Sequence, residues 1–302
     1  MKILVTGAAG FIGSAFCELA LRHGHEIAGL ILPELAPPSR LPAGGKMIWL
    51  KGTLAEPPWK SIAGFQPEVC VHFAWIATPG VYLESPENEL YLQWSLDLVH
   101  RLHGLGVDHI VGAGTCIEYR ISDAPLSEER TPVDPTTLYS RCKNALREAL
   151  AAEAQKDGWR FCWGRVFYPY GVGEHPARLC SALIQKLRRG EKLVLQTPDS
   201  RKDYIYIDDL AAAILLTVEK KFTGTINWGT GTGVSVREIA DLVAASLGRP
   251  ELVENQHPPA ADPFPFVIAD ARRLRELGWR PEVDLPAGLS KLVQQLAARQ
   301  VA

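Results

Sequence analysis

Short apolar runs alternate with longer amphipathic stretches through the first two thirds of the chain. An apolar run at residues 3–5 comes first, a helical pattern follows over 14–23, and a second apolar run covers 26–32. Continuous apolar runs of this length are typical of strands buried on both faces, whereas a period of 3.6 residues is typical of helices. The pattern therefore predicts βαβ units and a parallel sheet.

The same reading extends along the chain. Further strands are predicted at 47–50, 69–73, 109–111 and 160–166, and further helices at 89–105, 138–155 and 179–189. Residues 168–171 and 174–176 are rich in proline and glycine and are expected to be loops. The sequence thus predicts an α/β fold with an irregular region after residue 166.

Composition narrows the class of protein. The chain has 302 residues, 32 Lys+Arg against 34 Asp+Glu and a formal net charge of -2. This length allows one large domain, or one domain with a smaller partner. Near-neutral charge gives no basic field for nucleic acid, and the basic clusters at 186–189 and 272–275 lie within helical patterns. No nucleic-acid partner is therefore expected.

Other observations concern compartment and metals. The first apolar run ends at Val5, just before Gly7, too early for a signal peptide, and no later run reaches membrane length. The six cysteines are scattered and form no C-x-x-C pair, so neither a metal site nor a disulfide framework is expected. We therefore expect a cytoplasmic protein that has no membrane partner.

A glycine-rich turn follows the first predicted strand. It comprises Gly7, Ala9, Gly10 and Gly13, together with the apolar residues Phe11 and Ile12 at the start of a helix. Such a turn lets the backbone approach a pyrophosphate, while the helix N-terminus supplies N–H donors. This context predicts a dinucleotide site, in which Gly7 makes the tight turn and Gly13 packs the helix on the strand.

The end of the second predicted strand lacks the usual acid. Dinucleotide-binding units commonly place a carboxylate there, which bonds the ribose hydroxyls and disfavours a 2′-phosphate. Here the strand ends in Leu32 and Pro33, and Glu34 lies beyond the proline. The sequence therefore predicts NADP, with Arg40 as the nearest cation and NAD as the alternative cofactor.

Three polar residues form a candidate catalytic group. Tyr139 and Lys143 are four residues apart in a helical pattern, so they share one face. A nearby ammonium and an oxidised nicotinamide would both favour a phenolate, which can exchange a proton with a substrate. Thr115 follows the strand at 109–111, at the edge where ligands of parallel sheets bind, and is expected to hold the reacting oxygen.

Taken together, these motifs resemble a known family. The chain carries Gly7 to Gly13, His72-Phe73-Ala74, Thr115 four residues before Tyr119, the Tyr139/Lys143 pair, Arg165 with Tyr170-Gly171, and residues 203–209 in that order. In this it resembles the extended short-chain dehydrogenase/reductase superfamily, in its nucleotide-sugar epimerase, dehydratase and reductase branch. The resemblance implies a Rossmann-type doubly wound sheet with a smaller C-terminal α/β substrate-binding domain.

The resemblance also implies where the domains divide. Residues 1–166 with 201–226 would form the NAD(P)-binding domain, and 167–200 with 227–302 the sugar-nucleotide-binding domain. The helices at 89–105 and 138–155 would pair across a twofold in a homodimer.

The residue roles implied by the resemblance are as follows. Catalysis would rest on Thr115, Tyr139 and Lys143. Cofactor binding would involve Gly7, Ala9, Gly10, Phe11, Ile12, Gly13, Arg40, Thr53, Leu54, Phe73, Ala74, Trp75, Tyr139, Lys143 and Val166. Substrate binding would involve Trp75, Thr115, Cys116, Tyr168, His175, Arg178, Arg201 and Lys202.

Departures from the family pattern select among activities. Related 4,6-dehydratases carry an acid pair after the catalytic Thr, but this chain has Cys116 and Ile117 there. Because Ile117 cannot exchange a proton, dehydration is disfavoured. The missing acid after the second strand favours a 4-ketoreductase that transfers hydride between NADP(H) and C4 of a 6-deoxysugar nucleotide.

Alternatives to the reductase remain. The first is a nucleotide-sugar 4-epimerase that holds NAD tightly, and a flavonoid-type carbonyl reductase is disfavoured by the C-terminal motifs. The alternative of a different class is a non-catalytic dinucleotide-binding sensor or assembly subunit. It is disfavoured because both Tyr139 and Lys143 are present.

Overall fold

A seven-stranded parallel sheet forms the larger part of the molecule. The computed structural model describes residues 1–41 and 46–298. The strand order in the large sheet is β10-β6-β5-β4-β1-β2-β3, and every neighbouring pair is parallel. These strands are β1 (Lys2–Thr6), β2 (Glu26–Ile31), β3 (Met47–Lys51), β4 (Val69–His72), β5 (His109–Thr115), β6 (Arg160–Val166) and β10 (Gly224–Trp228).

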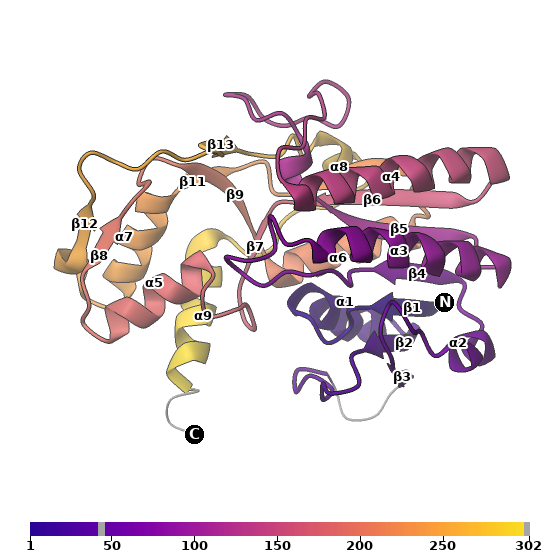
Figure 1. Cartoon of the computed structure of the whole chain (residues 1–302). Coiled ribbons are helices and arrows are strands. Elements are labelled where there is room, and N and C mark those ends of the chain that lie inside the picture. Colours follow the sequence, from indigo (N-terminus) through magenta and orange to yellow (C-terminus); the bar gives the residue numbers. More distant parts are fainter. Residues whose placement is uncertain (42–45, 299–302) are drawn as a thin grey trace.

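Helices cover both faces of this sheet (Figure 1). They are α1 (Phe11–Arg22), α2 (Trp59–Phe65), α3 (Glu87–Gly104), α4 (Leu138–Asp157) and α6 (Ile207–Glu219). Alternation within β1 shows how: Ile3 and Val5 join the core beneath α1 and α6, whereas Leu4 joins the core beneath α2, α3 and α4. A strand buried on both faces needs a continuous apolar run, which is the pattern seen in the sequence. The predicted Rossmann-type α/β fold is confirmed.

The order in which the chain visits the strands indicates the edge of the large sheet at which a ligand binds. From β1 the chain goes to β2 on one side and later to β4 on the other, so the strand order reverses beside β1. In open parallel sheets, ligands bind outside the carboxyl ends of the strands at such a reversal. The glycine-rich turn, the end of β4 and the end of β5 all lie at this edge.

A second, smaller part lies at one end of the large sheet, on the left in Figure 1. Its central strand β9 (Arg201–Tyr206) pairs with β7 (Tyr168–Tyr170), β11 (Gly233–Ser235) and β13 (Phe266–Val267). A further pair joins β8 (Leu193–Leu195) to β12 (Val253–Asn255). The helices α5 (Leu179–Arg188), α7 (Val236–Ser246) and α9 (Leu285–Ala298) pack on one another. Two short helices, η2 (Pro250–Leu252) and α8 (Arg272–Glu276), also lie in this C-terminal stretch of the chain. A third, η1 (Cys116–Glu118), directly follows β5 of the large sheet.

Three differences between the structure and the predicted elements exceed two residues or change the kind of element. Helix α1 begins at Phe11 rather than at residue 14, because the glycine turn leads directly into it. Strand β5 runs on to Thr115, four residues past its predicted end, since Gly112 and Gly114 make room for the Trp163 ring beside them. Residues 168–170 form β7 instead of a loop, because β9 offers a pairing edge that the local sequence does not reveal.

Strand pairing also bears on the expected domain ranges. Strand β9, placed at residues 201–206 in the NAD(P)-binding range, pairs within the second sheet, whereas β10 extends to Trp228 in the large sheet. Helices α3 and α4 pack on each other within one chain. The homodimer and the domain boundaries stay predictions.

Two sequence expectations concern the environment of the chain. All six cysteines are buried and unpaired. Among the described residues, no helix is long and apolar enough to cross a membrane.

Candidate active site

The glycine-rich turn between β1 and α1 is closely packed. Gly7 has φ of +67°, and a Cβ there would also lie 2.9 Å from the backbone nitrogen of Ala74. A Cβ on Gly13 would lie 2.2 Å from the Gly7 carbonyl oxygen. Only glycine fits these two positions, because one needs a left-handed conformation and both bring backbone against backbone. The turn therefore presents main chain, without side chains, at the start of α1.

A cavity of about 730 Å³ opens at this turn and follows the carboxyl edge of the sheet. It is lined by most of the residues that the sequence proposes for cofactor and substrate. These are Gly7, Ala9, Gly10, Phe11, Ile12, Gly13, Thr53, Leu54, Phe73, Ala74, Trp75, Thr115, Tyr139, Lys143, Val166, His175 and Arg178. The cavity thus joins the glycine turn to the Thr/Tyr/Lys group in one continuous space.

Five proposed residues do not line this cavity. Their side chains are engaged elsewhere: Arg40 pairs with Glu18 and Asp208, and Arg201 pairs with Glu238. Cys116 and Tyr168 pack in a separate apolar cluster.

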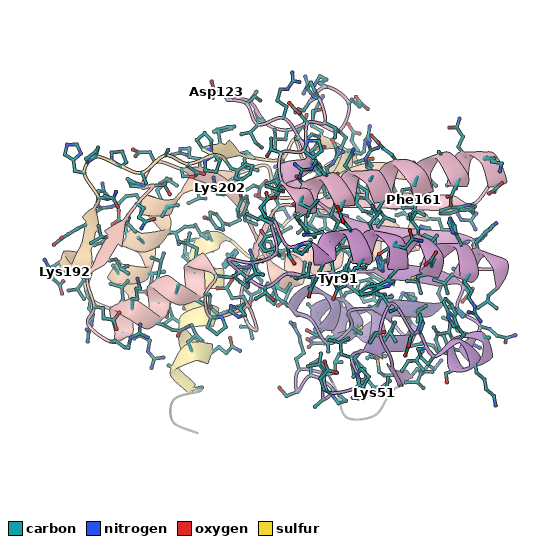
Figure 2. The ribbon with its side chains drawn as sticks, in the orientation of Figure 1. Lys51, Tyr91, Asp123, Phe161, Lys192 and Lys202 are labelled. Carbon is teal, nitrogen blue, oxygen red and sulfur yellow. The ribbon has the colours of Figure 1, made fainter. Side chains whose placement is uncertain are left out.

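The fifth, Lys202, is buried on β9. Its ammonium lies 2.9 Å from an Asp262 carboxylate oxygen and also donates to the Phe264 carbonyl. Figure 2 shows Lys202 among the strands of the second sheet. Tyr91, which does line the cavity, lies on α3. Each of these charges is held by a partner distant in sequence, which local patterns cannot reveal.

Helix α4 positions two members of the candidate catalytic group, Tyr139 and Lys143. Thr137 caps the helix by accepting from the Ser140 amide, so the first turn is fixed where Tyr139 sits. Lys143 follows one turn later, is 2% exposed, and donates from Nζ to the Ala113 carbonyl at 2.8 Å. Tyr139 is half-buried, and its ring meets the Tyr82 ring edge-on at 4.9 Å between centroids.

Burial governs the charge state of both groups. It raises the pKa of Tyr139 well above its ordinary value. Burial also lowers the pKa of Lys143 to about 7, although the negative charge of Glu118 opposes this. Desolvation thus favours the neutral phenol of Tyr139 in the protein alone, and the phenolate expected beside an oxidised nicotinamide stays a prediction.

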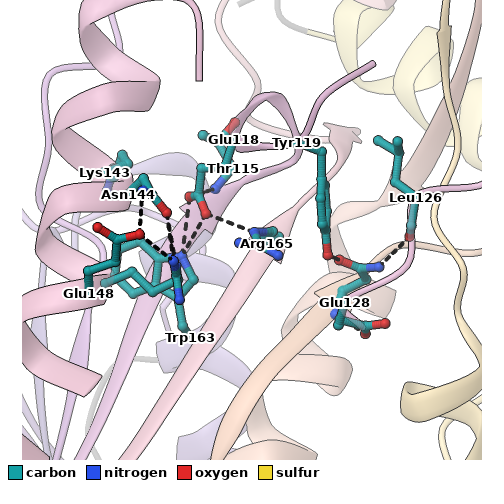
Figure 3. A network of polar contacts seen from close by, with 12 residues as sticks. Thr115, Glu118, Tyr119, Leu126, Glu128, Lys143, Asn144, Glu148, Trp163 and Arg165 are labelled. Carbon is teal, nitrogen blue, oxygen red and sulfur yellow. Dashed lines mark hydrogen bonds and ion pairs between the residues drawn. The ribbon is translucent and has the colours of Figure 1, made fainter. Parts of the chain in front are cut away.

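Glu118 anchors Thr115, a role that the sequence reasoning missed. This carboxylate is fully buried and accepts from the Thr115 amide at 2.8 Å and from Arg165 Nε at 2.8 Å (Figure 3). The Trp163 indole N–H donates to it at 3.1 Å. The available signal was an acidic residue next to apolar Ile117 directly after a buried strand, where a carboxylate needs a partner.

A buried hydrogen-bond chain fixes the end of β4. The Ala74 amide donates to Thr6 Oγ1 at 3.1 Å, and Thr6 Oγ1 lies 2.8 Å from His72 Nδ1. His72 Nε2 lies 2.9 Å from Ser95 Oγ, which donates its own proton to the Tyr91 carbonyl. Nε2 must therefore carry the ring proton, and Nδ1 accepts from Thr6. Burial and the Lys143 charge lower the pKa of His72 to about 3, so the ring stays neutral.

The end of the cavity beside β2 is apolar. Leu30, Leu32 and Leu35 line it beside Thr53, and the sequence had assigned none of these three leucines to the site. Lys51 lies nearby but donates to the carbonyls of Pro33 and Leu35. Among the described residues, no group of three or more His, Cys, Asp or Glu could hold a metal ion.

This fold and this site define a class of nicotinamide-dinucleotide enzyme, and comparison with known proteins gives its family. The profile of the NAD dependent epimerase/dehydratase family matches residues 3–229, and the chain belongs to that family. The suspected family is thereby confirmed, as is the prediction of an enzyme.

Several relatives match over nearly their whole length. The UDP-glucose 4-epimerase of Corynebacterium glutamicum is 29% identical over 93% of this chain and 91% of the relative. The dTDP-L-rhamnose 4-epimerase of Burkholderia thailandensis is 25% identical over 98% of this chain and 95% of the relative. The crystal structure of the Thermus thermophilus UDP-glucose 4-epimerase in complex with NAD has a TM-score of 0.86 and 27% identity, and covers 98% of this chain and 99% of that one.

Proposed function

We propose that the protein is a nucleotide-sugar 4-epimerase that retains NAD. The observation that carries the proposal is the single cavity that joins the glycine turn to Thr115, Tyr139 and Lys143. The curated relatives cited above, both 4-epimerases, support this activity over the ketoreductase that the sequence favoured.

The cavity fits a dinucleotide. A backbone-lined turn where side chains at Gly7 and Gly13 would clash suits a pyrophosphate at the start of α1. Phe73, Ala74 and Val166 would line the path to the catalytic end. When bound, NAD supplies a reversible hydride acceptor at the sugar carbon.

NAD is proposed over NADP because of Arg40. Its guanidinium is held by Glu18 at 2.7 Å and Asp208 at 3.2 Å, and it lies outside the cavity lining. The 2′-phosphate of NADP would therefore meet Leu32 and Leu35, since neither Arg40 nor Lys51 is among the described residues that line the cavity. Apolar contact from these leucines would take the place of the missing acid after β2.

The chain's own residues divide the chemistry. Tyr139 would exchange a proton with the hydroxyl at C4, and Thr115 would hold that oxygen by a hydrogen bond. Lys143 would supply positive charge beneath Tyr139, which stabilises the phenolate as it forms. His175 and Arg178, from the second part of the molecule, line the same cavity and would contact the nucleotide sugar.

The test is to incubate purified protein with UDP-galactose and NAD+ and to follow UDP-glucose by NMR, with dTDP-sugars in parallel. Interconversion of the two epimers without net NADH accumulation is the expected result. Tyr139→Phe should lower turnover by about 10²–10⁴-fold while NAD+ binding persists.

A different outcome would favour the second candidate. Stoichiometric oxidation of NADPH with a 4-keto-6-deoxysugar nucleotide, and no epimer interconversion, would establish the ketoreductase instead. The absence of a carboxylate after β2 is the observation that keeps this candidate.

A further inference from the structure

The Lys143 ammonium has few polar partners for a buried charge. It is 2% exposed, and its hydrogen-bond partner among the described residues is the Ala113 carbonyl, at 2.8 Å. An ammonium carries three N–H donors, and the Ala113 carbonyl accepts from one of them, whereas Lys143 also lines the cavity, where a bound ligand can accept from another. Burying such a charge is costly unless something else stabilises it.

Aromatic rings surround the rest of this charge. Lys143 Nζ lies 3.9 Å from the centroid of the Trp75 ring, and 5.9 Å and 6.0 Å from the centroids of Tyr139 and Trp163. A cation over an aromatic face is attracted by the ring quadrupole, and indole gives the strongest attraction. Trp75 is the nearest ring by about 2 Å and is therefore the main contributor.

A hydrogen bond to Asn88 fixes the orientation of the Trp75 ring. Its indole N–H donates to Asn88 Oδ1 at 2.8 Å, and Asn88 is fully buried. Asn88 Nδ2 in turn donates to the carbonyls of Tyr82 at 2.7 Å and Ser85 at 2.8 Å. Asn88 thus ties the indole to residues 82–85, which lie directly before α3.

The same segment reaches the other catalytic residue. The Tyr139 amide donates to the Leu83 carbonyl at 2.9 Å, and the Tyr82 ring packs edge-on against Tyr139. The segment that fixes Trp75 therefore also fixes the start of α4, so the indole and the two catalytic side chains are positioned together.

None of the other ionisable groups described around Lys143 offers its ammonium a free negative charge. Glu118 on η1 is the negative charge that raises the lysine's affinity for its proton, but its oxygens are occupied by Thr115, Trp163 and Arg165. His72 on β4 is neutral.

Tyr139, on the same helix as Lys143, is a neutral phenol at rest. Arg165 on β6 and Arg147 on α4 carry positive charge near Glu118 and cannot stabilise a second cation.

We propose that Trp75 is a positioning residue of this site. Its indole face stabilises the Lys143 ammonium and holds it 5.9 Å from the centre of the Tyr139 ring. The role builds on the proposed proton exchange at Tyr139, for which the lysine must be charged. Asn88 supports it by fixing the plane of the indole.

The test measures the lysine directly and needs no substrate. Protein labelled with ¹³C and ¹⁵N at lysine is titrated by NMR, and the resonance missing from Lys143→Arg is assigned to Lys143. We expect a midpoint of about 7 in the unaltered protein. Trp75→Leu, which keeps an apolar filler but removes the ring, should move the midpoint down by about one pH unit, and Trp75→Phe by less.

A matched control and a contrary outcome define the result. Trp59 carries a similar contact, with Arg101 at 4.4 Å from its ring centroid, and lies outside the cavity lining, so Trp59→Leu should leave the midpoint unchanged. An unchanged or raised midpoint in Trp75→Leu overturns the proposal, because Trp75 would then act only by excluding water. If Trp75→Leu fails to fold, the Trp75→Phe midpoint decides in the same way.

Turnover supplies a second, separable readout. With UDP-galactose, the pH at which kcat falls on the alkaline side should move down in Trp75→Leu by the same amount as the lysine midpoint. A shifted midpoint in protein that shows no epimerisation would support the role of Trp75 and refute the proposed function. Epimerisation with an unshifted midpoint would do the reverse.

Discussion

At the scale of single residues, this site is built from polar groups that burial has moved away from their ordinary charge states. Lys143 has its pKa lowered to about 7, Tyr139 has its pKa raised, and His72 is neutral between two hydroxyls. Burial of a charge opposes folding, and catalytic sites often retain such groups at a cost in stability.

Replacing the lysine should therefore stabilise the protein. Lys143→Met removes a buried charge while keeping an unbranched side chain as far as Cε, and we expect the free energy of unfolding to rise by about 1–3 kcal/mol at about pH 6. Urea unfolding followed by circular dichroism measures it, and turnover should be lost.

The pH dependence gives the sign of this effect. The folded lysine, with a pKa of about 7 against 10.5 for the ordinary group, binds its proton less tightly than the unfolded one. The unaltered protein therefore gains stability as pH rises from about 7 towards 10.5, and Lys143→Met does not. The difference between the two should narrow over that window, and a constant difference would mean that the lysine is not desolvated.

At the scale of elements, the junction of β5, η1 and β6 decides where Thr115 points. Glu118 on η1 pairs with Arg165 on β6 at 2.8 Å, and both side chains are nearly inaccessible to solvent. Arg165 also covers the Tyr119 ring at 4.0 Å, and the Tyr119 hydroxyl donates to Asn227 Oδ1 on β10. The ion pair thus joins the short helix η1 to β6, and the Tyr119 hydroxyl joins the residue after η1 to the neighbouring strand β10.

Neutralising one partner should be costly. Glu118→Gln leaves the Arg165 charge buried and uncompensated, so the free energy of unfolding should fall by about 3 kcal/mol. The double variant Glu118→Leu with Arg165→Met should lose far less free energy of unfolding than the sum of the losses in the two single variants. Denaturant unfolding of the full set measures this coupling.

An exposed pair gives the comparison. Arg160 and Asp108 also form an ion pair, at the opposite edge of the sheet, but their side chains are 38% and 58% exposed. Asp108→Asn should change the free energy of unfolding by less than about 1 kcal/mol. Equal losses at the two pairs would mean that burial does not set the strength of the Glu118 pair.

At the scale of the whole molecule, two parts of the chain enclose one cavity. The large sheet and its helices supply the glycine turn and the candidate catalytic group, and the second part supplies His175 and Arg178. A buried carboxylate joins the two parts: Asp209 on α6 accepts from the amides of Glu282 and Val283, each at 3.0 Å. A ligand that fills the cavity should therefore stabilise the molecule as a whole.

Cofactor binding should be visible as a change in stability. When NAD+ is added to cofactor-free protein at about 100 times its Kd, it should add about 2.7 kcal/mol to the free energy of unfolding, which for a chain of 302 residues corresponds to a rise in Tm of about 4 °C. NADP+ at equal concentration should give a smaller rise because Arg40 is already paired. Differential scanning fluorimetry measures both.

The glycine turn provides the control. Gly13→Ala places a Cβ against the Gly7 carbonyl, so the response to NAD+ should be lost. A larger rise with NADP+ than with NAD+ would contradict the cofactor proposed here.

The sequence by itself determined the features that depend on neighbouring residues. The turn at Gly7 to Gly13 and the spacing of Tyr139 and Lys143 are local, because a left-handed glycine and the helical period fix them within a few positions. The continuous apolar strands likewise predicted the doubly covered sheet.

Only the tertiary structure decided which charges are free and which are held. Arg40 meets Asp208 from 168 positions away and Lys202 meets Asp262 from 60 positions away, so neither serves the cavity. Trp75 comes to lie on Lys143, and Glu118 on Arg165, for the same reason. Such pairings depend on how strands are ordered in the sheet, and that order is set by packing across the whole chain rather than by any local pattern.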